Sequence, residues 1–274
     1  VSPGPGEPAV FWDPAAGVID RAPLEGLDAV VHLAGEPLAP GRWSRRKKNL
    51  ILASRTAGTT LLAQALAGLD SPPGVLASAS ATGYYGDRGD CLLNEDSPAG
   101  SSFLSGVCSQ WEEATSAAAA AGIRVVSLRI GMVLSPSGGA LAAMLPAFRV
   151  GLGGRFGHGE QYMSWIGIGD VLRAVAHCLY PGEISGPVNL VSPHPVQNRE
   201  FTRVLARVLG RPAFFHLPSF LLKAVLGPMA GELLLSSTRV EPARLLASGF
   251  SFIHPELEPA LECFLRRKDP PSGA

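Results

Sequence analysis

The side chains best suited to chemistry lie in one stretch, Ser78 to Asp87, which reads SASATGYYGD. A run of small and β-favouring residues, 74–77, precedes it, and the glycines within it mark sharp turns. The pattern is typical of an open-sheet strand whose carboxyl end, where ligands bind in such folds, carries hydroxyl groups into a crevice. The side chains placed there are Ser80, Thr82, Tyr84 and Tyr85. An ordinary strand-to-loop junction with buried small residues is the alternative.

Two further segments fit the same design. Residues 29–37, AVVHLAGEP, form an apolar strand that ends in Leu-Ala-Gly, and residues 164–179, SWIGIGDVLRAVAHCL, begin as a strand, with Asp170 predicted to cap a helix. In this order the three motifs resemble those of the extended short-chain dehydrogenase/reductases. The match is best with an epimerase-like subfamily that ends in a domain of unknown function, where the motifs read NLAGE, SASAVGYYGD and WIHIGD. The resemblance runs from residue 1 to about residue 265. It implies an NADP-dependent oxidoreductase or a protein like the nucleotide-sugar epimerases.

The start of the chain does not match this family. The family opens with a strand, a Gly-x-x-Gly-x-x-Gly loop and a helix whose N-terminus holds the cofactor pyrophosphate. Residues 1–6 resemble instead the segment after the family's second strand, and the first residue is not Met. We therefore expect an N-terminally truncated sheet. The sequence would then be a fragment, a splice or gene-model product, or a protein that has lost this unit. We also expect weak NADP binding or none, since Pro3 and Gly4 replace the basic pair that would contact the 2′-phosphate.

Four residues are predicted to contact the cofactor. Ala34 and Gly35 end a strand, where small side chains let a dinucleotide lie close to the backbone, and a tight strand exit is the alternative. The resemblance places Arg55 on a phosphate or an adenine, with a surface arginine as the alternative. It also places Val133, which follows the strand RVVSLRI, where the family's backbone passes the nicotinamide.

The predicted catalytic residues are Ser80, Tyr84 and Tyr85. The resemblance matches Ser80 with the serine that hydrogen-bonds the substrate oxygen. The family's usual Tyr-x-x-x-Lys pair, which moves the proton, is absent, and Leu104 and Cys108 occupy its two positions. Tyr84 or Tyr85 is therefore predicted to replace the missing acid–base, although one could instead pack at a lobe interface. A non-catalytic binding or regulatory protein, or an inactive truncated isoform, is the alternative function.

Composition limits the partners. The 274 residues carry a formal net charge of 0 and are 46% hydrophobic and 17% charged, so nothing favours nucleic acid as a partner. No apolar run reaches membrane-spanning length, and the four scattered cysteines show no metal-site spacing. Cysteines scattered in this way indicate a reducing, intracellular compartment, the cytoplasm first, with an organelle left open by the unmatched N-terminus. The expected partners are a small-molecule substrate and a second copy of the chain in a homodimer.

The elements expected to position these residues alternate between strand and helix. Strands are predicted at 28–33, 75–80 and 124–130 and helices at 47–69 and 103–121, which predicts an α/β, doubly wound, parallel Rossmann-like sheet. Residues 1–150 would form this domain, 151–268 a smaller, partly interleaved α/β lobe on the substrate side, and 269–274 a flexible tail. The glycine-rich segment 151–159 resembles the family's loop beside the active cleft. The elements predicted for the second lobe are helices at 141–150, 198–209, 219–226 and 257–265 and strands at 187–191 and 213–217.

Overall fold

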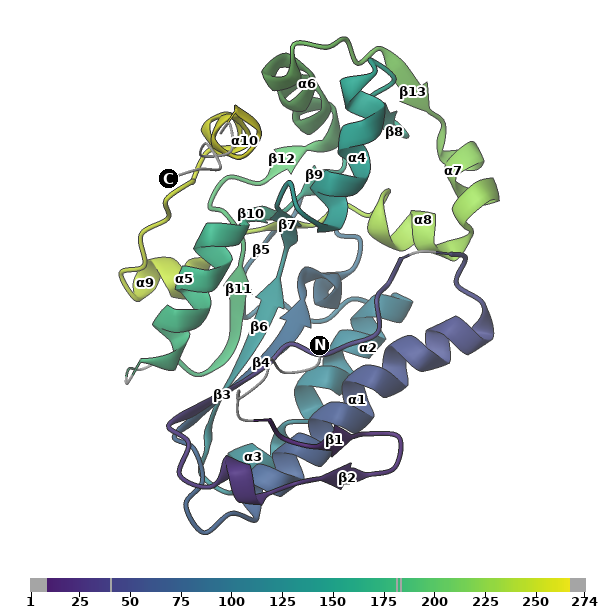
Figure 1. The fold of residues 1–274 in the computed structure, drawn as a ribbon. Coiled ribbons are helices and arrows are strands. Elements are labelled where there is room, and N and C mark those ends of the chain that lie inside the picture. Colours follow the sequence, from purple (N-terminus) through teal and green to yellow (C-terminus); the bar gives the residue numbers. More distant parts are fainter. Residues whose placement is uncertain (1–8, 40, 181, 183, 267–274) are drawn as a thin grey trace, which may run out of the picture.

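A sheet of four parallel strands forms the centre of the protein (Figure 1). The structure is a computed structural model that describes residues 9–39, 41–180, 182 and 184–266. The strand order is β11 (Gly186–Leu190), β6 (Arg124–Ile130), β4 (Val75–Ala81) and β3 (Ala29–His32). Ala29 pairs with Val75 and His32 with Ser78 in parallel register. The predicted α/β fold with a parallel sheet is therefore confirmed.

Helices cover both faces of this sheet (Figure 1). α1 (Arg45–Ala67), α2 (Phe103–Glu113) and α3 (Ser116–Ala120) lie on one face, and α5 (Ile168–Leu179) lies on the other. The alternation of side chains along β4 explains how both faces are covered. Leu76 packs in a cluster with residues of α1 and α3, whereas Val75 and Ala77 pack in a second cluster with residues of α5.

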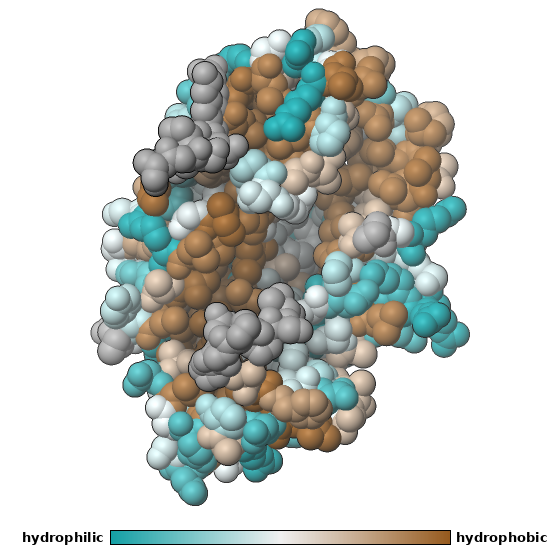
Figure 2. All heavy atoms as spheres, viewed as in Figure 1, coloured by the Kyte–Doolittle hydropathy of each residue, from teal (hydrophilic) through white to brown (hydrophobic). Residues whose placement is uncertain are grey.

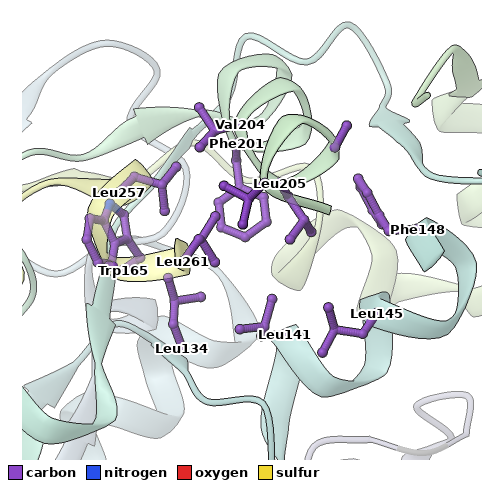
Figure 3. Close-up of a cluster of buried hydrophobic side chains, with 13 residues drawn as sticks. Leu134, Leu141, Leu145, Phe148, Trp165, Phe201, Val204, Leu205, Leu257 and Leu261 are labelled. Atoms are coloured by element: carbon purple, nitrogen blue, oxygen red, sulfur yellow. The ribbon is translucent and has the colours of Figure 1, made fainter. Parts of the chain in front are cut away.

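A second lobe stands over the carboxyl ends of the strands. Its core joins α4 (Gly139–Arg149), α6 (Asn198–Leu209) and α10 (Leu257–Arg266). Figure 3 shows Phe201 of α6 in one apolar cluster with Leu261 of α10, Leu141 of α4 and Trp165, so segments far apart in sequence pack together. The chain crosses between the lobes more than once, since β11 returns to the central sheet. The domain boundary at residue 150 stays a prediction.

Short elements complete the described part. Among these residues, no helix is both long enough and apolar enough to cross a bilayer. The other helices are the 3₁₀ turns η1 (Ala22–Leu24) and η2 (Thr82–Tyr85), and α7 (Ser219–Leu226), α8 (Pro228–Leu233) and α9 (Ala243–Ala247). The other strands are β1 (Trp12–Asp13), β2 (Val18–Ile19), β5 (Leu92–Leu93), β7 (Met132–Leu134), β8 (Gly154–Phe156), β9 (Tyr162–Met163), β10 (Trp165–Gly167), β12 (Val196–Gln197), β13 (Phe215–Leu217) and β14 (Arg239–Val240).

Two details of the predicted helices are wrong. The expected single helix over 103–121 is two helices, α2 and α3, and the Thr115 hydroxyl donates to the Glu112 carbonyl at 2.7 Å where they part. Such a local side-chain bond competes with helical pairing. Asp170 does not cap α5, because the helix begins at Ile168, with Gly167 at the cap. Asp170 is instead fully buried, and its carboxylate accepts the backbone N–H groups of residues 253 and 254 at 2.7 and 2.9 Å.

Candidate functional site

A cavity of about 750 Å³ lies at the carboxyl ends of β4 and β6, between the sheet and the second lobe. Ala81 and Thr82 line it at the end of β4, and Ile130 and Gly131 line it at the end of β6. α1, α2, α4 and α8 supply further walls. Figure 2 shows the molecule hollowed near the middle of this face, between two areas of apolar surface. The cavity occupies the place where ligands of open α/β sheets bind.

Arg55 lines the cavity from α1 and lies directly against the turn after β3. A Cβ added to Gly35 would come 3.2 Å from the Arg55 Cζ, so the absence of a side chain at Gly35 makes room for the guanidinium. Arg55 Nη1 donates to the carbonyls of Glu36 and Ile51 at 3.0 and 3.1 Å, and the guanidinium lies over the Trp111 ring at 4.9 Å. Burial lowers the pKa of Arg55. Among the described residues, its Nε and Nη2 have no hydrogen-bond partner.

Of the four predicted cofactor residues, the structure places one on the cavity wall and two beside residues that line it. Arg55 lines the cavity, and Gly35 lies against the Arg55 side chain. Val133 pairs with Ile166 between β7 and β10 and packs against the core, while its neighbour Met132 lines the cavity. The cofactor contacts of Ala34, Gly35, Arg55 and Val133 stay predictions.

Ser80 belongs to a buried polar network beneath the cavity. Its hydroxyl donates to Glu112 Oε1 at 2.7 Å, and Arg129 donates to both carboxylate oxygens of Glu112, each at 2.9 Å. Burial disfavours the Arg129 charge, but the hydrogen bonds and the charge of Glu112 raise its pKa above the ordinary value. The network therefore ties the ends of β4 and β6 to α2. Ser80 is 3% exposed and supports the cavity floor.

The two predicted tyrosines continue this network. Tyr85 is fully buried, donates to Asn189 Oδ1 at 2.7 Å and accepts from Arg129 Nη1 at 3.0 Å. Burial raises the pKa of Tyr85 to about 12. Tyr84 packs edge-on against the Tyr85 ring and lies under the Arg129 guanidinium at 3.5 Å. This arrangement links the β4 end to β11. The catalytic roles of Ser80, Tyr84 and Tyr85 stay predictions.

Three residues that line the cavity carry a hydroxyl group without a protein partner in the described part of the chain. They are Thr82 in η2, Tyr162 in β9 and Ser236 after α8, and the last two come from the second lobe. The Arg239 guanidinium lies over the Tyr162 ring at 5.0 Å. The sequence pointed to Thr82 through its motif, but Tyr162 has no nearby lysine and no motif of its own. The pairing of β9 with β12 and the backbone hydrogen bonds of Tyr162 to Ser237 and Thr238 hold this tyrosine at the site.

Cys108 and Glu232 complete the walls. Cys108 stands where the family has lysine, and burial, followed by the charge of Glu112, raises its pKa to about 11, so the thiol is neutral at pH 7. Glu232 reaches from α8 to the first turn of α2 and accepts the Leu104 N–H at 2.7 Å and the Phe103 N–H at 3.2 Å. No sequence signal connects Glu232 with α2. The described residues contain no group of three or more His, Cys, Asp or Glu that could hold a metal.

A parallel sheet with a cavity at its carboxyl edge and a second lobe above it defines a dinucleotide-type α/β protein. The family model for the NAD dependent epimerase/dehydratase family matches residues 16–190, and that for a domain of unknown function, DUF1731, matches residues 217–263. The chain belongs to the NAD dependent epimerase/dehydratase family. The resemblance found in the sequence is thereby confirmed for both parts of the chain.

Similar proteins agree with this assignment. An epimerase family protein of Mycobacterium bovis is 44% identical over 92% of this chain and 83% of its own length. A crystal structure of the human epimerase family protein SDR39U1 with NADPH has a TM-score of 0.84 at 35% identity and covers 89% of this chain and 84% of the human chain. A nucleoside-diphosphate sugar epimerase from Corynebacterium glutamicum has a TM-score of 0.76 at 35% identity, covering 97% of this chain and 51% of that one.

Proposed function

We propose that this protein is an NADP-dependent oxidoreductase that uses the cavity at the ends of β4 and β6 for hydride transfer to or from a small molecule. The observation that carries the proposal is the position of the cavity in a chain similar to a human protein crystallised with NADPH. Family membership supports a nicotinamide cofactor. The epimerase alternative uses the same cofactor and the same cavity, because epimerisation can pass through a transient oxidation.

The residues that line the cavity suit a phosphate and the nicotinamide ring of such a cofactor. Arg55 keeps Nε and Nη2 free of protein partners in the described residues, which is the geometry a guanidinium needs to contact a phosphate. The apolar side chains of Ile130 and Met132 offer an apolar wall, which suits the neutral nicotinamide ring. When bound, the nicotinamide supplies a hydride donor or acceptor.

The chain's own residues then hold the substrate and handle the proton. Thr82 hydrogen-bonds the reacting oxygen, and Tyr162 donates or takes its proton, since both residues line the cavity and their hydroxyls have no competing protein partner among the described residues. Ser80 keeps Glu112 and Arg129 in place beneath them. The absence of Tyr-x-x-x-Lys favours the second candidate, a non-catalytic binding protein, and NADPH consumption with a carbonyl panel separates the two.

A fluorescence titration of NADPH tests the proposal. We expect a saturable signal that Arg55→Gln weakens about tenfold, through loss of one charge-assisted contact. Arg45→Gln is the matched control, because Arg45 is exposed on the same helix and does not line the cavity. A signal that does not saturate, or equal effects of the two variants, would contradict the proposed site.

Location and assembly are proposed on separate grounds. Among the described residues the four cysteines are free, which supports a reducing compartment inside the cell. Mass spectrometry of alkylated protein from cells would reveal any disulfide.

A small-molecule substrate is proposed from the cavity volume. The predicted homodimer stays a prediction that sedimentation velocity would test.

A further inference from the structure

The part of the cavity beyond Arg55 has mainly apolar walls, with a few hydroxyl side chains among them. α4 contributes alanine and methionine side chains, β8 and β9 contribute an aromatic ring and a methionine, and the end of α8 and the residue after it contribute leucines. The residues concerned are Ala143, Met144, Phe156, Met163, Leu233 and Leu234. Among the described residues that line the cavity, Arg55 is the one basic side chain, and no lysine or histidine joins it. Any ligand outside the reach of Arg55 therefore meets a surface without a cation.

The backbone donors at the start of α2 that could hold an anion are already used. A helix N-terminus ordinarily attracts a phosphate or a carboxylate. At the N-terminus of α2, beside the cavity, Glu232 fills this place by accepting the N–H groups of Phe103 and Leu104, and the Ser102 hydroxyl accepts that of Ser105. Glu232 also lines the cavity. The protein's own carboxylate thus occupies the local anion position.

A second carboxylate increases the negative charge of the walls. Asp87 lines the cavity and accepts the Ser237 N–H at 3.1 Å and the Gly89 N–H at 3.3 Å. The charged side chains of the cavity wall are thus two carboxylates, Asp87 and Glu232, and one arginine, Arg55. Because we assign Arg55 to the cofactor, no positive charge on the wall remains for the diphosphate of a nucleotide sugar. Enclosing such a charge without a partner is costly.

We infer that the cavity takes an uncharged, mainly apolar carbonyl compound or the matching alcohol, rather than a nucleotide sugar. This substrate class rests on the proposed function for its chemistry. Reduction of the carbonyl adds one hydride from the nicotinamide to carbon and one proton from Tyr162 to oxygen, which gives the alcohol and the oxidised cofactor. The methionines of the wall adapt to apolar ligands of different shapes, and Thr82 and Tyr162 supply the polar end.

Saturation-transfer NMR with two probes, 2-nonanone and UDP-glucose, tests the substrate class on the full chain, with and without NADP. Ala143→Trp is the blocking variant, because Ala143 is an exposed residue of α4 that lines the cavity. Ala147→Trp is the matched control, one turn further along the same helix, exposed and away from the cavity. Melting curves show whether each variant is folded.

We expect saturable 2-nonanone binding that Ala143→Trp weakens by at least about tenfold, through lost apolar contact, and that Ala147→Trp leaves unchanged. UDP-glucose should give no saturable signal at millimolar concentration. The inference is overturned if UDP-glucose binds and Ala143→Trp displaces it, if neither probe binds, or if both variants weaken 2-nonanone equally. The NADPH titration separates the two proposals, since ketone binding without NADPH binding would reject the proposed function and leave the ligand class standing.

Discussion

Replacing Glu112 with glutamine should remove the charge that balances Arg129 inside the protein. Arg129 is 3% exposed and Glu112 is 16% exposed, so neither group can turn to bulk water. The carboxylate accepts three hydrogen bonds, one from Ser80 and two from Arg129. A glutamine keeps one oxygen and points an NH₂ group at a donor, so at least one of these bonds is lost and the guanidinium is left without its counter-ion.

Breaking a buried ion pair costs about 3–5 kcal/mol. We expect the lower end for Glu112→Gln, about 3 kcal/mol, because the Tyr85 hydroxyl and the Glu95 carbonyl still accept from Arg129 and the Tyr84 ring still lies under it. This loss corresponds to a melting temperature lower by roughly 6–12 °C in a chain of this size.

Circular dichroism during thermal and urea unfolding measures the change. Glu113→Gln is the matched control, since Glu113 is the next residue on α2 and is exposed, and its free energy of unfolding should change by no more than about 0.5 kcal/mol. If Glu112→Gln lowers the free energy of unfolding by less than about 1 kcal/mol, the buried network does not stabilise the cavity floor as described.

Three further outcomes are expected. Tyr162→Phe should lower the rate of carbonyl reduction about 100-fold with little change in NADPH affinity, whereas Tyr180→Phe, at a residue that is 72% exposed, should change neither in steady-state assays. Burial lowers the pKa of His32, so the unfolded chain binds the proton first as the pH falls below 6.5. The stability that His32 contributes is retained above that pH and lost below it. The slope of the unfolding free energy against pH, between about pH 7 and pH 5.5, should therefore be smaller in His32→Gln than in the unsubstituted protein. Equal slopes would contradict this. Iodoacetamide at pH 8 should label the exposed Cys91 well before the buried Cys108, whose pKa is about 11, and equal labelling rates by mass spectrometry would refute that burial.

The sequence predicted the sheet because local pattern and topology agree there. The runs at 29–32, 75–81 and 124–130 are short and apolar, and the helices between them carry apolar residues at helical spacing. Helix ends were harder to place. Thr115 divides one predicted helix through a single hydroxyl bond, and Asp170 uses its carboxylate on a distant turn and not as a cap.

The motif at 78–87 correctly predicted that the site lies at the carboxyl edge of the sheet. It did not predict which of its hydroxyl residues lines the cavity. Ser80 lies within β4 and its hydroxyl faces Glu112, whereas Thr82 begins the 3₁₀ turn η2 after the strand, and the change of backbone direction there lets it line the cavity. Tyr162 and Glu232 come from the second lobe, and only the packing of the two lobes brings them to β4 and α2. Contacts of this kind depend on tertiary geometry, to which neither spacing nor composition is sensitive.

Hydrogen–deuterium exchange with and without NADPH tests the location of the cofactor site most directly. We expect slower exchange in 34–38, 82–88 and 131–133, the segments at or beside the cavity wall, when NADPH is added. The arginine-rich groove formed by α6 and β13 is the internal reference, because it would attract the phosphates by charge alone. Protection confined to residues 199–216, or no protection at any segment, would contradict a cofactor site at the carboxyl ends of β4 and β6.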